Sequence, residues 1–143
     1  MKTLKKLLEE RPARAPLSVS PDDTVFSALE LMAKHDIGAV LAMRDGQLAG
    51  IFSERDYARK IVLLGKTSRE TLVSAIMTAD VICVTPEQSD DKCLAIMTDR
   101  RIRHLPVLED GRLAGIISIG DVVKAIIADQ RVMINHLEDY IHG

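Results

Sequence analysis

The apolar positions of the chain change their period along residues 25–52. Residues 25–32 repeat at helical spacing, with apolar side chains at Val25, Ala28, Leu29 and Met32. Residues 38–43 are then almost continuously apolar, and the dipeptide Asp45-Gly46 separates them from a second apolar run, 48–52. An Asp-Gly pair between two such runs is a strong hairpin signal. The pattern predicts a helix followed by a β-hairpin.

The same order returns later in the chain. An amphipathic segment that includes Leu94 and Met97 precedes an apolar run at 104–108, the dipeptide Asp110-Gly111 and a run at 113–117. Each predicted hairpin leads into a second predicted helix, at 54–64 and at 119–129. A short extended piece that ends at a proline turn opens each unit, because proline keeps its predecessor extended. The order β-α-β-β-α is therefore predicted twice.

The two units are copies of one another. A shift of 65 positions aligns residues 19–62 with 84–127 without a gap, and 14 of the 44 aligned positions are identical. One unit of this size buries little surface by itself. We therefore expect an α/β (α+β) fold in which two units related by a pseudo-twofold axis share a core and leave two equivalent clefts.

Three segments lie outside the repeats. Residues 2–10 and 131–142 are predicted as flanking helices, polar enough for the surface or an interface, and a short helix is predicted around 69–77.

Composition narrows the class of protein. The net charge is −2 with both signs interspersed, and aromatic residues make up 3% of the chain, which disfavours nucleic acid and an anionic membrane as partners. Charges and Pro12 interrupt the N-terminal segment before a signal peptide can form, and no apolar run is long enough to span a membrane. Two separated cysteines and four scattered histidines form no metal motif. We expect a cytoplasmic protein without a metal, and no catalytic motif is recognisable.

One motif occurs in both units. Gly50-Ile51-Phe52-Ser53-x-x-Asp56 is matched by Gly115-Ile116-Ile117-Ser118-x-x-Asp121. Each predicts a strand that ends at a helix N-terminus, where backbone N–H groups and the helix dipole favour a phosphate. The acidic residue is suited to accept hydrogen bonds from a ribose diol. A glycine inside each strand indicates close approach of a ligand or another backbone segment.

The same spacing has a purely structural interpretation. Ser-x-x-Asp at a helix start is also a capping box, in which serine and acid satisfy each other's backbone N–H groups. A duplication copies a cap as faithfully as a binding site, so the repeat leaves both interpretations open.

A basic run distinguishes the two units. Residues 100–104 read Arg-Arg-Ile-Arg-His, whereas the equivalent residues 35–39 are nearly neutral and small. A charged run is often only a solvated face, but this asymmetry favours a phosphate-binding role for the arginines.

Taken together, these patterns resemble the tandem CBS domain pair, or Bateman module. The resemblance rests on Ser/Thr-Pro, the helix ending in Met, Ile-x-x-Leu-Pro-Val at 102–107, and Asp-Gly-x-Leu-x-Gly-Ile-x-Ser-x-x-Asp. It implies a first CBS motif at 14–65, a second at 66–129 with a linker at 66–79, and a C-terminal helix at 130–143, all in one CBS-pair domain.

The resemblance also implies roles for individual residues. Asp56 and Asp121 would hold ribose hydroxyls, and Ser53 and Ser118 would meet ribose or phosphate. The basic residues Arg103 and His104 would reach the phosphate of a nucleotide held at Asp56, with Arg55 as a further phosphate ligand. The residues before the proline turns, Ser20 and Thr85, would line the adenine. The first repeat departs from the pattern at Gly38, Ala39 and Leu41, so the Asp121 cleft is expected to bind more weakly or to take another nucleotide.

The function that follows is that of a sensor. We expect a non-catalytic module that binds AMP, ADP, ATP or NAD, forms a homodimer and signals to a separate effector protein. The rival interpretation is a ligand-free module that only dimerises or docks on a partner. An enzyme or a nucleic-acid regulator is disfavoured by the neutral charge and the missing motifs.

Overall fold

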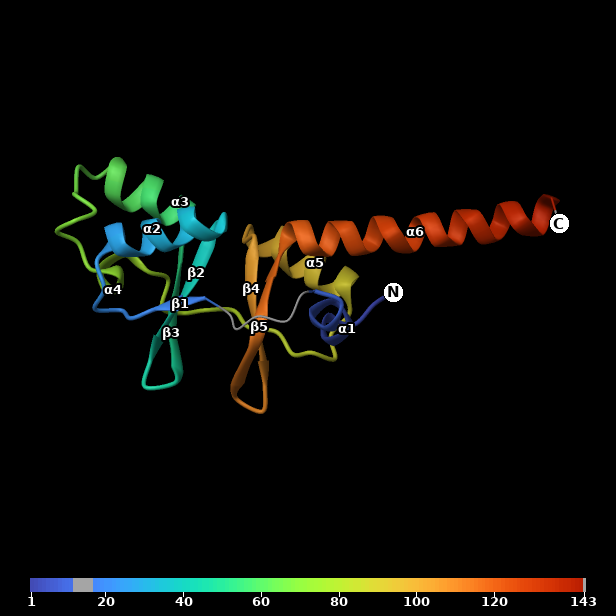
Figure 1. Ribbon diagram of the computed structural model, residues 1–143, viewed down its shortest axis with the longest axis horizontal. Helices are drawn as coiled ribbons and strands as arrows, with labels where there is room; N and C mark the ends of the chain where they lie inside the picture. The colour runs from blue at the N-terminus through green and yellow to red at the C-terminus, as the bar shows by residue number, and fades with distance from the viewer. Residues whose placement is uncertain (12–16, 143) are drawn as a thin grey trace. The chain divides into compact units, whose positions relative to one another are not determined.

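A computed structural model describes residues 1–11 and 17–142 of the chain, which divide into two compact units (Figure 1). One unit comprises Pro16–Val81, and the other combines Met1–Ala15 with Ile82–Gly143. Each unit contains one copy of the repeat. Both are mixed α/β, as predicted.

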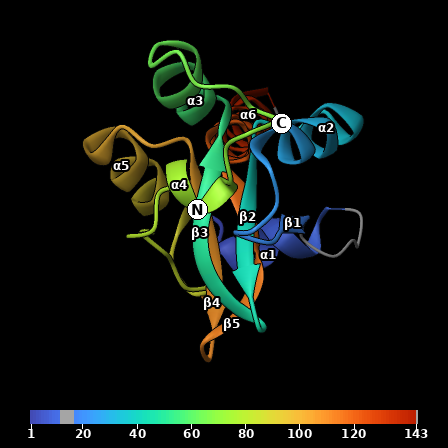
Figure 2. The same cartoon turned by 90° about the vertical axis from the view of Figure 1, so that its left-hand side faces the viewer.

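The unit of residues 16–81 is built on a three-stranded sheet. Strand β1 (Ser18–Val19) runs parallel to β2 (Ala39–Arg44), which pairs antiparallel with β3 (Gln47–Ser53). Helix α2 (Val25–His35) precedes β2 and α3 (Glu54–Tyr57) follows β3, so both lie at the end of the hairpin opposite its turn (Figure 2). Buried side chains of this unit form one core, which includes Phe52, Val25 and Val40.

The second unit repeats this arrangement around β4 (His104–Glu109) and β5 (Arg112–Ser118). Val84 makes an isolated parallel bridge to Val107, in the place that β1 takes in the other unit. Helix α5 (Asp90–Arg100) precedes the hairpin and α6 (Ile119–His142) follows it. The core of this second unit includes Leu105, Ile117 and Met97.

The two hairpin turns confirm the Asp-Gly prediction. Asp45 and Asp110 both have φ 52°, and Gly46 and Gly111 have φ 75° and 77°. Two consecutive positive φ angles define the turn whose twist matches antiparallel strands, and glycine is the residue that adopts them at least cost.

Four predicted helices differ from those observed. The helix expected at 54–64 is α-helical only over Glu54–Tyr57 and continues as a π-helix, η1 (Ala58–Val62). The helix expected around 69–77 is shorter, α4 (Val73–Ile76). The helices expected at 119–129 and 131–142 are one, α6, because no glycine or proline interrupts residues 121–142.

The helix that precedes each repeat packs on the other repeat. Helix α1 (Leu4–Glu9) belongs to the unit of the second repeat, where the Leu4 N–H donates to the Gln88 carbonyl (2.9 Å). Helix α4 belongs to the unit of the first repeat, where the Val73 N–H donates to the Asp23 carbonyl (2.8 Å). Leu4 and Val73 are fully buried. Residues 2–10 were predicted to lie on the surface or at an interface, and α1 does pack against the second repeat, with its apolar face buried in that core. Each compact unit therefore contains parts of both halves of the chain.

Candidate functional site

The repeated motif forms the same strand-to-helix junction in both units. At the end of β3 the Ser53 N–H donates to Asp56 Oδ2 (2.9 Å) and the Asp56 N–H donates to Ser53 Oγ (3.3 Å). At the end of β5 the Ser118 N–H donates to Asp121 Oδ2 (2.9 Å) and the Asp121 N–H donates to Ser118 Oγ (3.2 Å). The capping box, one of the two interpretations that the sequence allowed, is therefore formed in both repeats.

The cap uses only part of each carboxylate. Two carboxylate oxygens together accept about four hydrogen bonds, and in both repeats the capping backbone N–H goes to Oδ2 alone. The side chain of Asp56 is 13% exposed and that of Asp121 is 32% exposed. A capping role therefore leaves acceptor capacity on both carboxylates.

A cation lies beside each carboxylate. Lys60 Nζ is 3.2 Å from Asp56 Oδ1 and also donates to the Ile76 carbonyl (2.9 Å). In the other unit Arg11 Nη1 is 3.2 Å from Asp121 Oδ2. Neither cation was among the residues predicted from the sequence. The spacing of four residues was a usable signal for Lys60 on a helix, whereas Arg11 is 110 residues from Asp121 and no local pattern marks it.

The basic pair Arg103 and His104 lies next to Ser118 in its own unit. His104 is the direct cross-strand partner of Ser118, and the Ile119 N–H at the start of α6 donates to the Arg103 carbonyl (2.8 Å). Directly opposite residues of an antiparallel pair project from the same face. In the other unit Ala39 is the partner of Ser53. The predicted charge asymmetry therefore falls on equivalent positions of the two junctions.

The two residues predicted to line the adenine are not beside these junctions within their own units. Val19 pairs with Ala42, so Ser20 lies beside the C-terminal end of β2. Ser53 pairs with Ala39 at the N-terminal end of the same strand. Four strand residues separate these ends, about 13 Å. The Val84–Val107 bridge places Thr85 likewise, far from Ser118. Both residues are held in local turns: Ser20 Oγ accepts from the Asp22 N–H (3.1 Å), and the Thr85 N–H donates to Gln88 Oε1 (3.0 Å).

Both strand glycines mark a close approach of protein. A Cβ atom on Gly50 would lie 2.9 Å from the Thr78 carbonyl oxygen, whose segment pairs with Ile51, and 2.6 Å from Met77 Sδ. A Cβ atom on Gly115 would lie 2.8 Å from Leu8 Cδ2. The close approach that the sequence indicated is therefore made by the segments around α4 and α1, at the third residue before each serine. Arg55 is the remaining candidate and lies exposed in α3.

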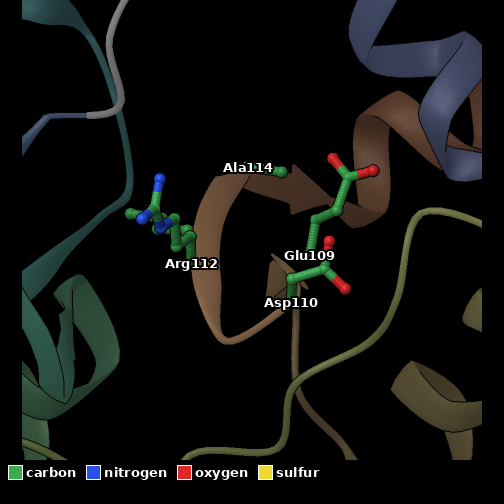
Figure 3. A pocket seen from close by; sticks show the side chains of 5 residues that line it. Glu109, Asp110, Arg112 and Ala114 are labelled. Carbon is green, nitrogen blue, oxygen red and sulfur yellow. The ribbon is translucent and has the colours of Figure 1, made fainter.

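An open cavity of about 400 Å³ lies at the tip of the β4–β5 hairpin, away from the junction at Ser118. Figure 3 shows that Glu109 and Asp110 point to the opposite side of the hairpin from Arg112. These charges do not converge, so we assign no ligand to this cavity. Among residues 1–11 and 17–142, no three His, Cys, Asp or Glu side chains gather to hold a metal ion, and no helix is both long and apolar enough to cross a membrane.

These features define a class: a duplicated β-α-β-β-α unit with a capped Ser-x-x-Asp junction in each copy. The CBS domain family matches residues 8–63 and 73–128. The chain belongs to this family, which confirms the resemblance seen in the sequence. The limits of 14–65, 66–129 and 130–143 for its parts stay predictions.

A curated relative supports the same assignment. The chain is 44% identical over 127 residues to the CBS domain-containing protein CBSX3, mitochondrial, of Arabidopsis thaliana. The match covers 85% of this chain and 62% of the relative, so the chain spans less than two thirds of that protein's length.

Solved structures agree on the fold. A protein with CBS domains from Burkholderia ambifaria MC40-6 superposes with a TM-score of 0.87 at 50% identity, over 90% of this chain and 96% of that one. The CBS domain pair of protein MJ0100, solved in complex with 5′-methylthioadenosine and S-adenosyl-L-methionine, superposes with a TM-score of 0.78. It is 23% identical and covers 90% of this chain and 98% of that one, so this likeness concerns the fold alone.

Proposed function

We propose that the chain is a regulatory module that binds an adenosine nucleotide of the AMP, ADP, ATP or NAD class and signals to a separate protein. The observation that carries the proposal is the paired arrangement of a carboxylate and a cation at each junction. Asp56 has Lys60 at 3.2 Å, and Asp121 has Arg11 at 3.2 Å. An acceptor for a ribose diol beside a donor for a phosphate is the set of groups that a nucleotide requires.

Individual side chains take the following roles in this proposal. Asp56 and Asp121 accept hydrogen bonds from ribose hydroxyls with the oxygen that the cap does not use. Ser53 and Ser118 offer hydroxyl groups beside them. The phosphate meets basic side chains, for which the candidates are Arg55, Lys60, Arg11, Arg103 and His104. Ser20 and Thr85 remain candidates for the adenine.

One solved structure of the same fold holds ligands of this class. The MJ0100 pair is solved with two ligands that both carry an adenosyl group. Adenosyl compounds share the adenine and the ribose diol with AMP, ATP and NAD. A ligand of this class is therefore compatible with the fold, and the repeated carboxylates are the residues of this chain that we assign to the diol.

The first experiment identifies the ligand and measures its effect on stability. Purified protein is denatured, released small molecules are identified by mass spectrometry, and ligand-free protein is then heated with each adenylate. A ligand present at 100 times its Kd stabilises the folded state by about 2.7 kcal/mol. For a chain of this size we expect the melting temperature to rise by roughly 6–10 °C. If no adenylate raises the melting temperature at millimolar concentration, the proposal is wrong.

The variants must separate binding from capping. Asp56→Asn and Asp121→Asn keep one oxygen that accepts the capping N–H but lose the second acceptor and the charge. We expect each to reduce the ligand-induced shift. Thr24→Ala is the matched control, because Thr24 Oγ1 caps α2 by accepting from the Ser27 N–H (3.1 Å) and is not a candidate for ribose. It should lower the melting temperature and leave the ligand-induced shift unchanged.

A second candidate function is a ligand-free module for dimerisation or docking. The two complete capping boxes favour it, because they give Ser53, Asp56, Ser118 and Asp121 a structural role without any ligand. If the unaltered chain binds no adenylate and the Asp→Asn variants only lower the melting temperature, the motif serves the cap and this second function holds.

The proposal includes three further expectations. The module is non-catalytic, and it forms a homodimer. It resides in the cytoplasm, where thiols stay reduced; Cys93 is a buried free thiol. Cell fractionation checks the location, and mixing ligand with protein should return the nucleotide chemically unchanged.

A further inference from the structure

Helix α6 continues beyond the core that its first turns cover. Val122 and Ala125 are buried in the core of its unit, whereas every residue from 131 to 142 is exposed. Figure 1 shows the C-terminal part of α6 extending past α1 and α5 of the same unit. The side chains of this free part therefore determine what the helix can contact.

A stripe of side chains, all apolar except Gln130, runs along α6 from its packed turns into its free part. Its positions follow one another at alternating intervals of four and three residues: Val123, Ile127, Gln130, Ile134, Leu137 and Ile141. The exposed fractions of Ile134, Leu137 and Ile141 are 53%, 57% and 73%. Alternation of three and four is the heptad pattern of a coiled coil, and an exposed apolar stripe of this kind marks an interaction surface.

We propose that this stripe binds the same stripe of a second copy of the chain, with the two α6 helices antiparallel. The proposal refines the homodimer expected above by assigning its contact surface. Isoleucine occupies the first heptad position three times, at 127, 134 and 141, and Leu137 occupies the fourth. Apolar residues at the first and fourth heptad positions form the contact seam between two helices of a coiled coil.

One twofold arrangement pairs every position of the stripe. In it Ile127 meets Leu137 of the second copy, Ile134 meets Gln130, and Ile141 meets Val123. The overlap runs from 123 to 141 and is about 27 Å long at 1.5 Å per residue. Gln130 is the one polar position, and a polar residue in such a seam selects the register at some cost in stability.

Charges beside the stripe favour the antiparallel direction. Lys124, Arg131 and Glu138 follow one another at intervals of seven residues on the same flank of the stripe, and all three are exposed. In the antiparallel pair, Lys124 of each chain faces Glu138 of the other chain, which gives two pairs of opposite charge. Arg131 faces Arg131 of the second chain. The other flank carries Met133 and Tyr140, so a parallel pair would form no ion pair between the flanks. The charges therefore complement themselves only when the helices run in opposite directions.

The first test measures the mass of the full chain in solution. Sedimentation over roughly 1–100 µM should show association of the unaltered chain, and Ile134→Glu should halve the mass of the assembly. Val132→Glu is the matched control, because Val132 is equally exposed at 53% but lies outside the stripe. It should leave the mass unchanged, and circular dichroism should show both variants folded.

The outcomes of this test separate the homodimer itself from the contact through α6. A single-chain mass for the unaltered protein overturns both this inference and the homodimer of the proposed function. An assembly that Ile134→Glu leaves intact, or that both variants disrupt equally, overturns the inference on α6 and leaves the homodimer standing. Nucleotide binding has its own readout in the melting temperature.

The second test measures the direction of the helices. Lys124→Glu reverses two attractive pairs of the antiparallel arrangement and should raise the Kd of association roughly tenfold. Lys124→Glu combined with Glu138→Lys exchanges the charges and should restore the original Kd. A parallel pair predicts no such rescue, so failure of the double variant to recover overturns the antiparallel arrangement.

Discussion

Arg11 donates a hydrogen bond to the carboxylate of Asp121 across 110 residues of sequence, with 3.2 Å between Nη1 and Oδ2. The equivalent carboxylate, that of Asp56, is paired with Lys60, only four residues further along the chain. Two copies of one motif therefore recruit their cations in different ways, and this difference provides a first prediction.

Arg11→Ala should have a small effect on stability. Both side chains of the pair are about one third exposed, and solvent-screened pairs of this kind contribute about 0–1 kcal/mol. Urea unfolding at low and high salt measures the change, which should shrink as salt is added. Lys60→Met is the comparison and should cost more, because it also removes the donor to the Ile76 carbonyl. A loss above roughly 2 kcal/mol for Arg11→Ala, unaffected by salt, would contradict this assignment.

Gly50→Ala should destabilise the fold more than Gly115→Ala. The new methyl group at 50 meets the Thr78 carbonyl oxygen at 2.9 Å, a backbone atom held by its hydrogen bond from the Ile51 N–H. At 115 it meets the end of the flexible Leu8 side chain at 2.8 Å. Overpacking of this kind costs about 1–3 kcal/mol, and the rigid neighbour should place Gly50→Ala at the upper end. Thermal and urea unfolding of the two variants side by side measure the order, and equal losses would contradict it.

Asp90→Val should lower the free energy of unfolding by about 1–3 kcal/mol, the cost of leaving buried donors unpaired. Asp90 is 2% exposed, and its carboxylate accepts from the backbone N–H of Asp91 (2.7 Å) and of Lys2 (3.4 Å). Valine is the residue at the equivalent position of the first repeat, Val25, so its shape suits the fold. Asp90→Asn keeps an acceptor and should cost less. An Asp90→Val variant more stable than the unaltered chain would show that burial of the charge outweighs these bonds.

Cys93 should react slowly with thiol reagents. Burial raises the pKa of the Cys93 thiol from its ordinary value of 9.0 to about 11, and the nearby Asp90 carboxylate adds to the effect. Since the thiolate is the reactive form, disulfide-exchange reagents at pH 8 should modify Cys93 only after unfolding.

The raised pKa of the Cys93 thiol also predicts how the stability of the folded state changes with pH. A folded-state pKa above the unfolded value contributes stability that is present below pH 9 and is lost as the pH rises toward 11. Cys93→Ala, which installs the residue of the equivalent position Ala28, should remove this part of the alkaline decline. Identical alkaline unfolding curves for both chains would argue against the raised pKa.

Local sequence determined the elements and their duplication. The alternation of apolar runs, the two Asp-Gly turns and the identical spacing of 65 residues predicted both hairpins and the helices before them, because these features depend on contacts between near neighbours. The Ser-x-x-Asp spacing likewise defined both junctions. It could not separate a cap from a ligand site, since both need the same two residues at a helix start.

Only the tertiary structure decided which distant segments complete each unit. The exchange of α1 and α4 between the repeats, the approach of Leu8 to Gly115 and the ion pair of Arg11 with Asp121 join residues that share no local pattern. Such contacts form where burial of apolar surface outweighs the entropy of closing a long loop, and that balance depends on the whole packed core. The sequence therefore specified two copies of one unit, while packing determined how each copy is completed and that Arg11 lies beside the carboxylate of Asp121.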